Sequence, residues 1–264
     1  MLEPGQIVSH YRILECLGKG AMGVVYGARD LKLDRPVALK FLSPSLSRSH
    51  FERERLLSEA RTASKLNHPG ICVIYDVEEL ESSETFIAME LVVGSTLSRR
   101  INKRPMSILE VSSISMQVAR AIEAAHLRGV LHRDIKSANV MIDAHGRARV
   151  MDFGLAVRRD EANPERQARE MGTLAYIAPE LLQGQTADER SDMYSFGVIL
   201  YEMLTGQVPF CSTDAATVAY SILTSDPQPV EQLRGDVPHA LAATVDRLLK
   251  KDPSERYADM GGSG

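Results

Sequence analysis

The chain has 264 residues, of which 44% are hydrophobic and 25% charged, so it can bury a core in one large domain or two smaller lobes, and it is not a disordered chain. Its 31 Lys and Arg and 35 Asp and Glu give a net charge of −4, which excludes an overall basic field, and we expect no nucleic-acid partner. No apolar run approaches the roughly 18 residues of a membrane span, and the N-terminus does not resemble a signal peptide, so we expect a cytoplasmic chain.

The first part of the chain, up to about Leu91, is predicted to be rich in strands, because short apolar runs lie between glycines and prolines. The expected strands cover residues 11–14, 24–26, 37–41, 71–77 and 86–91. One helix is expected over 49–66, where Leu56, Ala60 and Ala63 recur at helical spacing.

After Gly94 the hydrophobic period becomes helical. One helix has an apolar face formed by Val111, Ile114, Val118, Ile122 and Ala125. Gly129 lies where a C-cap glycine is expected, and residues 140–142 and 148–150 predict a hairpin. A helix over 191–205 is apolar on nearly every side, which predicts a central, buried position, and a last helix is expected around 241–249. The predicted fold class is α+β, a small antiparallel sheet with one main helix followed by a larger helical lobe.

The three cysteines, Cys16, Cys72 and Cys211, are far apart and have neither CxxC nor Cys/His spacing. This pattern favours thiols packed in the core, in a reducing compartment, over disulfides or a zinc site.

Three glycines, Gly18, Gly20 and Gly23, form the pattern GxGxxG. Glycines at this spacing let the backbone approach phosphate oxygens, because no Cβ intervenes. A dinucleotide-binding loop would lead into a helix, whereas Val24 and Val25 predict a strand. Alone, the pattern fits a phosphate-binding loop and a ligand-free hairpin equally well.

Lys40 ends the strand Val37-Ala38-Leu39-Lys40, and Glu59 lies on the face of the expected helix that is directed at the sheet. The two side chains could form an ion pair. A solvated lysine and a surface glutamate are the alternatives.

Two further segments decide between these alternatives. Residues 132–139 read H-R-D-I-K-S-A-N, and residues 152–154 read D-F-G. With the glycine loop, the V-A-x-K lysine and the A-P-E at 178–180, they resemble the protein kinase family in order and approximate spacing, and in detail the bacterial branch of the eukaryotic-like serine/threonine kinases. The resemblance covers about residues 11–256 and implies a bilobal catalytic domain. Its expected parts are an N-lobe of about 1–91, a hinge of about 90–94 and a C-lobe of about 95–260.

The resemblance implies transfer of the ATP γ-phosphoryl group to Ser or Thr hydroxyls of protein substrates, with Asp134 as the base. Lys136 would neutralise charge on the transferring phosphate, and Asn139 and Asp152 would hold Mg²⁺, with Mn²⁺ as an alternative. Thr173 would bridge Asp134 and Lys136.

The same resemblance places the nucleotide. Lys40, paired with Glu59, would contact its α and β phosphates. The glycine loop that covers the phosphates would comprise Leu17, Gly18, Lys19, Gly20 and Gly23. Apolar residues would enclose the adenine, with Val25 and Ala38 as the roof, Met141 as the floor, Met89 as the gatekeeper, and the backbone of Glu90 and Val92 as the hinge.

Other family positions imply structural roles. Glu180 is expected to form a buried ion pair with Arg256, and Asp192 to anchor the backbone of the catalytic loop. His126 and His132 are interpreted as packing residues without a part in catalysis.

Two departures from the family pattern stand out. Residues 153–172 contain no Ser, Thr or Tyr, although Arg133 is the residue that in many relatives binds a phosphorylated loop residue. We therefore expect activation without phosphorylation of this loop, with an acidic side chain near Arg133 instead. The candidates for that side chain are Glu161, Glu165 and Glu170. Ser137 replaces a common proline, a change that removes no functional group.

An alternative is a pseudokinase that binds nucleotide as a scaffold, although such proteins usually lack one of the equivalents of Lys40, Asp134, Asn139 and Asp152. A small-molecule kinase is disfavoured by the segments at 172–173 and 178–180. Family members often continue into a membrane span and a sensor domain. The glycine-rich residues 261–264 are interpreted as a flexible tail at a domain boundary, so the missing span describes this chain alone.

Overall fold

The computed structural model describes residues 2–20, 23–43, 50–80, 84–102, 104–153 and 171–262. The chain divides into two compact units, Met1–Val93 and Gly94–Gly264.

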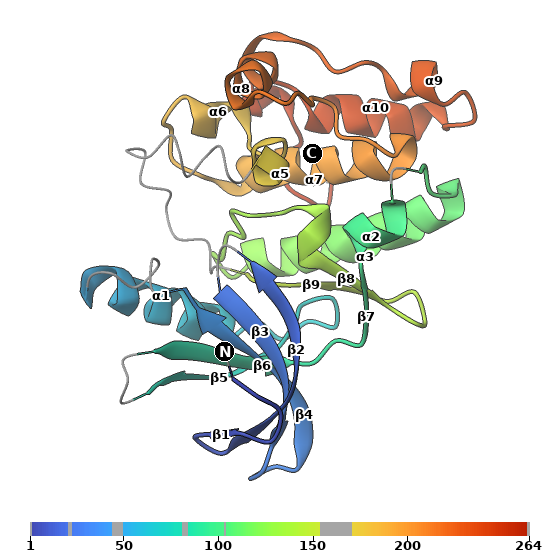
Figure 1. Ribbon diagram of the computed structural model, residues 1–264. Coiled ribbons are helices and arrows are strands. Elements are labelled where there is room, and N and C mark those ends of the chain that lie inside the picture. Colours follow the sequence, from blue (N-terminus) through green and yellow to red (C-terminus); the bar gives the residue numbers. More distant parts are fainter. Residues whose placement is uncertain are drawn as a thin grey trace. The chain divides into compact units, whose positions relative to one another are not determined.

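The first unit is built on an antiparallel sheet of six strands in the order β1-β2-β3-β4-β6-β5 (Figure 1). Its elements are β1 (Ile7–Val8), β2 (Tyr11–Gly20), β3 (Gly23–Asp30), β4 (Arg35–Leu42), α1 (His50–Ala63), β5 (Ile74–Glu79) and β6 (Thr85–Glu90). The predicted strands and helix are thus present. The strand expected from residue 71 begins later, at Ile74, and the helix expected over 49–66 ends earlier, at Ala63; residue 49 lies outside the described residues.

Residues of five adjacent strands form the core of this unit. The buried set is Val8, Tyr11, Ile13, Tyr26, Ala28, Val37, Leu39, Phe86 and Ala88. Phe41 stacks on Phe86 with ring centroids 5.2 Å apart, and Tyr11 contacts Phe86 edge to face at 5.7 Å. This packing fixes the register of β4 on β6, in which Ala38 lies opposite Met89.

The second unit is mainly helical, with one three-stranded antiparallel sheet (Figure 1). Its first elements are β7 (Gly94–Thr96), α2 (Leu97–Ile101), α3 (Ile108–His126), η2 (Ser137–Asn139), β8 (Val140–Asp143) and β9 (Ala148–Val150). The later ones are α5 (Met171–Leu174), α6 (Pro179–Leu182), α7 (Glu189–Thr205), α8 (Ala215–Thr224), α9 (Val230–Leu233), α10 (His239–Leu248) and η3 (Pro253–Glu255).

Helix α7 is the centre of this unit, as its all-round apolar sequence predicted, and it packs against α3, α9 and α10. Asp188 starts α7 with a capping box, since its side chain accepts from Ser191 N while Ser191 Oγ accepts from Asp188 N. Helix α3 buries the predicted apolar face.

The prediction for the end of α3 is confirmed. The last residue in helical hydrogen bonding is followed by a short turn, and Gly129 closes the helix in the left-handed conformation with φ 69°. Gly129 N donates to the His126 carbonyl at 2.8 Å and Val130 N donates to the Ala125 carbonyl at 3.0 Å, the two bonds of a Schellman motif.

None of the three cysteines forms a disulfide, and Cys72 is buried as expected. Cys16 and Cys211 are exposed, against the expectation of core packing. Cys16 lies in the part of β2 beyond Ile13, where successive residues are exposed. Among the described helices, none has the length and apolar character required to cross a membrane.

Candidate active site

Asp134, Lys136 and Asn139 converge at the loop before β8. Lys136 Nζ lies 2.8 Å from Asp134 Oδ2, and Asn139 Nδ2 donates to Asp134 Oδ2 at 3.0 Å and to the Asp134 carbonyl at 2.8 Å. Asp134 and Asn139 are buried. The carboxylate is therefore held in one orientation by two donors, one of them cationic.

Thr173, on α5, joins this group through Lys136. Lys136 Nζ donates to Thr173 Oγ1 at 3.0 Å and to Asp134 Oδ1 at 3.1 Å. Within the described residues, Thr173 reaches Asp134 only through the lysine. The expected bridge therefore has Lys136 at its centre instead of Thr173.

Asp192, in the first turn of α7, fixes the backbone before Asp134 as predicted. Its carboxylate accepts from His132 N at 2.8 Å and from Arg133 N at 2.9 Å. Arg133 has φ 66°, a left-handed conformation that costs a non-glycine residue about 1–3 kcal/mol. The two hydrogen bonds to a buried carboxylate offset this cost.

The two histidines have positioning contacts, in agreement with the prediction that they pack. His132 Nε2 donates to the Met151 carbonyl at 2.8 Å, and Nδ1 accepts from Asp134 N at 3.2 Å. These bonds assign the ring proton to Nε2, because the carbonyl can only accept. His126 Nε2 lies 2.9 Å from Asp192 Oδ2.

Asp152 follows β9 and is tied to the same loop. Met151 N donates to the Asn139 carbonyl at 2.8 Å, which fixes the residue before Asp152, and Asp152 itself has φ 61°. Because Asn139 uses Nδ2 toward Asp134, its Oδ1 is left to accept or to ligate. One amide oxygen and one carboxylate match the small oxygen donor set that Mg²⁺ uses when phosphates supply further ligands, so the residues fit a divalent cation.

A buried chain of hydroxyl groups links the catalytic loop to α7. Ser137 Oγ lies 2.9 Å from Tyr176 OH, which donates to Glu202 Oε2 at 2.5 Å. Ser195 Oγ donates to the Tyr176 carbonyl at 2.7 Å. Sequence reasoning missed this chain, and the one signal for it was the unusual serine at 137.

Glu180 and Arg256 form the predicted buried pair. Arg256 donates from both terminal nitrogens to the two carboxylate oxygens, each at 2.8 Å. Ser191 Oγ adds a bond to Glu180 Oε1 at 2.9 Å.

The predicted glycine loop lies at the β2–β3 turn. A Cβ on Gly23, which has φ 135°, would overlap the Phe41 carbonyl, so the fold itself requires glycine there. A Cβ on Gly18 or Gly20 would meet no described atom within 4 Å. Two of the three glycines are therefore unexplained by the packing of the described residues, which is consistent with close approach of a ligand. Leu17 and Lys19 are exposed on β2.

Lys40 is buried on β4, opposite Val25 of β3, and Glu59 lies on α1. Their ion pair stays a prediction. Leu56 is not among the side chains that the structure describes, whereas Ala60 and Ala63 are buried as expected.

The predicted adenine residues of the first unit lie on neighbouring strands. Ala38 and Met89 are buried and directly opposite each other, and Val25 is half-buried. Glu90 N donates to the Val73 carbonyl at 2.8 Å, so Glu90 can offer a hinge ligand only its carbonyl. The backbone N–H of Val92 has no acceptor among the described residues, so it is available for the predicted hinge hydrogen bond to the adenine. Met141 is half-buried on β8 of the second unit.

The residues expected near Arg133, which are Glu161, Glu165 and Glu170, lie outside the described residues.

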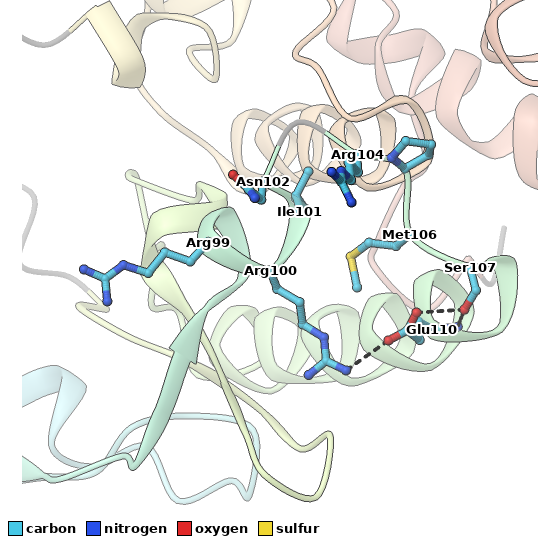
Figure 2. A pocket seen from close by; sticks show the side chains of 9 residues that line it. Arg99, Arg100, Ile101, Asn102, Arg104, Met106, Ser107 and Glu110 are labelled. Atoms are coloured by element: carbon cyan, nitrogen blue, oxygen red, sulfur yellow. Dashed lines mark hydrogen bonds and ion pairs between the residues drawn. The ribbon is translucent and has the colours of Figure 1, made fainter.

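A pocket of about 340 Å³ lies between the end of α2 and the start of α3. Arg99, Arg100 and Arg104 line it, but Figure 2 shows that they point in different directions. Arg100 lies 2.9 Å from Glu110 and lowers the pKa of that carboxyl, with Ser107 adding a hydrogen bond. The guanidinium groups do not converge on one point, so we assign no anion site here.

Comparison with known proteins identifies similar chains. Residues 11–260 match the family described as protein kinase domain. The chain is 39% identical over 263 residues to serine/threonine-protein kinase PknB of Mycolicibacterium smegmatis and 38% identical over 262 residues to that of Mycobacterium leprae. Each alignment covers 97% of this chain but 42% of the relative, so the chain spans about two-fifths of the length of these relatives.

The crystal structure of the Mycobacterium tuberculosis PknI kinase domain is similar in fold. It has a TM-score of 0.80 and 28% sequence identity, and the match covers 98% of this chain and 96% of that one.

Proposed function

The chain belongs to the protein kinase domain family, and we propose that it is an ATP-dependent protein serine/threonine kinase. The observation that carries this proposal is Lys136, whose ammonium group joins the carboxylate of Asp134 to the hydroxyl of Thr173. The carboxylate of Asp134 and the hydroxyl of Thr173 thus both contact the ammonium group of Lys136. A substrate hydroxyl and a phosphoryl group can meet at this place.

Asp134 is assigned as the base that accepts or orients the proton of the substrate hydroxyl. Its carboxylate is oriented by Lys136 and Asn139, so little reorganisation is needed when the hydroxyl binds. Lys136 places positive charge beside the attacked phosphoryl group, where negative charge spreads over the equatorial oxygens.

Gly18, Gly20 and Gly23 are assigned to the phosphates of ATP, together with Lys40 held by Glu59. Backbone N–H groups without an intervening Cβ, and one buried cation, suit a chain of anionic oxygens. The Glu90 carbonyl and the Val92 N–H are assigned to the adenine edge.

Asn139 Oδ1 and the Asp152 carboxylate are assigned as ligands of Mg²⁺, with Mn²⁺ as an alternative. When bound, the cation neutralises charge on the β and γ phosphates. Asn139 would thus serve two tasks, since its amide nitrogen orients Asp134. We further propose that the domain acts in the cytoplasm, on proteins.

Transfer of labelled γ-phosphate to a generic protein substrate, followed by mapping of the modified residues, tests the proposal. We expect label on Ser and Thr, dependent on a divalent cation and lost in Lys40→Met. Nucleotide binding without transfer would instead indicate a scaffold, and label confined to a small molecule would indicate a different substrate class.

A further inference from the structure

Ser137 lies between two residues of the candidate site, Lys136 and Asn139, and its hydroxyl contacts Tyr176. Lys136 contacts Asp134 and Thr173, and Asn139 contacts Asp134. Ser137, on η2, is buried and has Tyr176 OH as its partner at 2.9 Å. A hydroxyl is therefore present at the point where the loop contacts the segment after α5.

The proton positions along this chain follow from counting donors. Tyr176 has one hydroxyl proton, which it donates to Glu202 Oε2 at 2.5 Å, a distance typical of a bond to a carboxylate. The Ser137 hydroxyl must then donate to the phenol oxygen. Both protons point from the loop toward α7, and the carboxylate of Glu202 terminates the chain.

The charges at the end of the chain agree with this order. Burial raises the pKa of Glu202, while the hydrogen bond from Tyr176 opposes that rise. Burial and the neighbouring Glu202 carboxylate raise the pKa of Tyr176, so the phenol keeps its proton. Tyr176 is also held at its carbonyl by Ser195.

We propose that Ser137 is a positioning residue for phosphoryl transfer, which fixes Lys136 and Asn139 relative to Thr173 through Tyr176 and Glu202. The proposal rests on the proposed kinase function. Proline at this position would lack a hydroxyl, so the serine adds a contact that the bare loop does not have.

Two variants remove the contact from opposite ends. Ser137→Ala removes the donor, and Tyr176→Phe removes the acceptor with little change in volume. We expect Ser137→Ala to lower kcat about two- to tenfold, the effect of one net hydrogen bond, and Tyr176→Phe to lower it at least as much, because it also removes the donor to Glu202. The Kd for ATP is expected to be unchanged in both. The double variant is expected to be no slower than the slower single variant. Ser115→Ala is the control, because its hydroxyl donates to the Val111 carbonyl on its own helix, α3, and has no other hydrogen-bond partner in the described part of the chain.

Amide hydrogen exchange provides a second readout that needs no activity. Both variants are expected to speed exchange at residues 136–139 and around Thr173, with α3 unchanged. Wild-type rates of exchange at these residues in both variants would overturn the proposal, as would multiplicative kcat losses in the double variant. An inactive wild-type protein whose variants still show the faster exchange would reject the kinase function and retain the positioning role.

Discussion

Arg256 donates two parallel hydrogen bonds of 2.8 Å to Glu180, and the arginine side chain is fully buried. Its remaining N–H groups donate to the carbonyls of Lys250, Lys251 and Arg190. The pair therefore joins the segment after α10 to the start of α6 and, through Ser191, to α7. All of its donors are satisfied, which is the condition for a buried ion pair to be tolerated.

Arg256→Met is expected to lower the free energy of unfolding by about 3–5 kcal/mol, because it leaves the Glu180 carboxylate buried without its partner. Arg147→Met is the control. It removes an exposed pair with Asp143, whose loss is expected to cost less than about 1 kcal/mol. Urea denaturation measures the free energy of unfolding of both variants. Equal decreases would show that the buried pair stabilises the fold no more than the exposed pair does.

Asp192→Asn is expected to lower kcat about 100-fold, because one of the two loop amides loses its acceptor and Asp134 shifts. The matched variant Glu189→Gln, at an exposed position one turn earlier on α7, should keep wild-type kcat. Steady-state kinetics with thermal melts compares them, and a folded Asp192→Asn protein with full kcat would contradict the anchoring role.

Two glycines of the predicted glycine loop are expected to have different roles, one in the stability of the fold and the other in ATP binding. Gly23→Ala is expected to lower Tm, because the new Cβ would overlap the Phe41 carbonyl. Gly20→Ala should leave Tm unchanged and weaken ATP binding, because a Cβ there meets no described atom but would stand between the backbone and a phosphate. Calorimetric ATP titration and thermal melts give both quantities. ATP binding by Gly20→Ala as tight as that of wild type would remove the loop from the nucleotide site.

Burial lowers the pKa of Lys251 to about 8. Its ammonium group donates to the Ile222 carbonyl at 2.7 Å and lies over the Phe210 ring. Because the folded-state pKa lies below the unfolded-state value of 10.5, the unfolded chain binds more protons between these two values, and the free energy of unfolding should rise with pH from about 8 to 10.5.

Lys251→Met should remove this rise, whereas Lys250→Met, at an exposed neighbouring position, should retain it. Urea denaturation at several pH values distinguishes them. Identical pH dependence in the two variants would show that Lys251 is not the responsible group.

The absence of Ser, Thr and Tyr from residues 153–172 predicts activity without phosphorylation of this segment. Mass spectrometry after incubation with ATP and Mg²⁺, together with activity after phosphatase treatment, checks this. We expect undiminished activity, and a stoichiometric phosphate on Thr173 that activity requires would refute it.

Local pattern predicted most of the fold. The spacing of Val111, Ile114 and Val118 predicted α3, and the short apolar run over residues 37–41 predicted β4. Gly129 correctly marked the end of α3, because a glycine adopts without steric cost the left-handed conformation that closes a helix.

The candidate site contains one part that the sequence predicted and one part that it did not. Asp134, Lys136 and Asn139 lie within one short loop, so their convergence follows from the motif. Ser137, Tyr176 and Glu202 are brought together from three segments by the packing of α7, and each alone reads as an ordinary polar residue. The sequence showed Ser137 only as a replacement for a common proline, whereas the structure shows that its hydroxyl contacts Tyr176.

Single-turnover phosphoryl transfer by Asp134→Asn tests the central claim most directly, with the Kd for ATP measured on the same protein. The neutral amide keeps the shape and contact with Asn139 but cannot accept the substrate proton. We expect wild-type ATP affinity and a rate lower by about 100-fold or more. A folded Asp134→Asn protein that transfers phosphate at the wild-type rate would contradict the account.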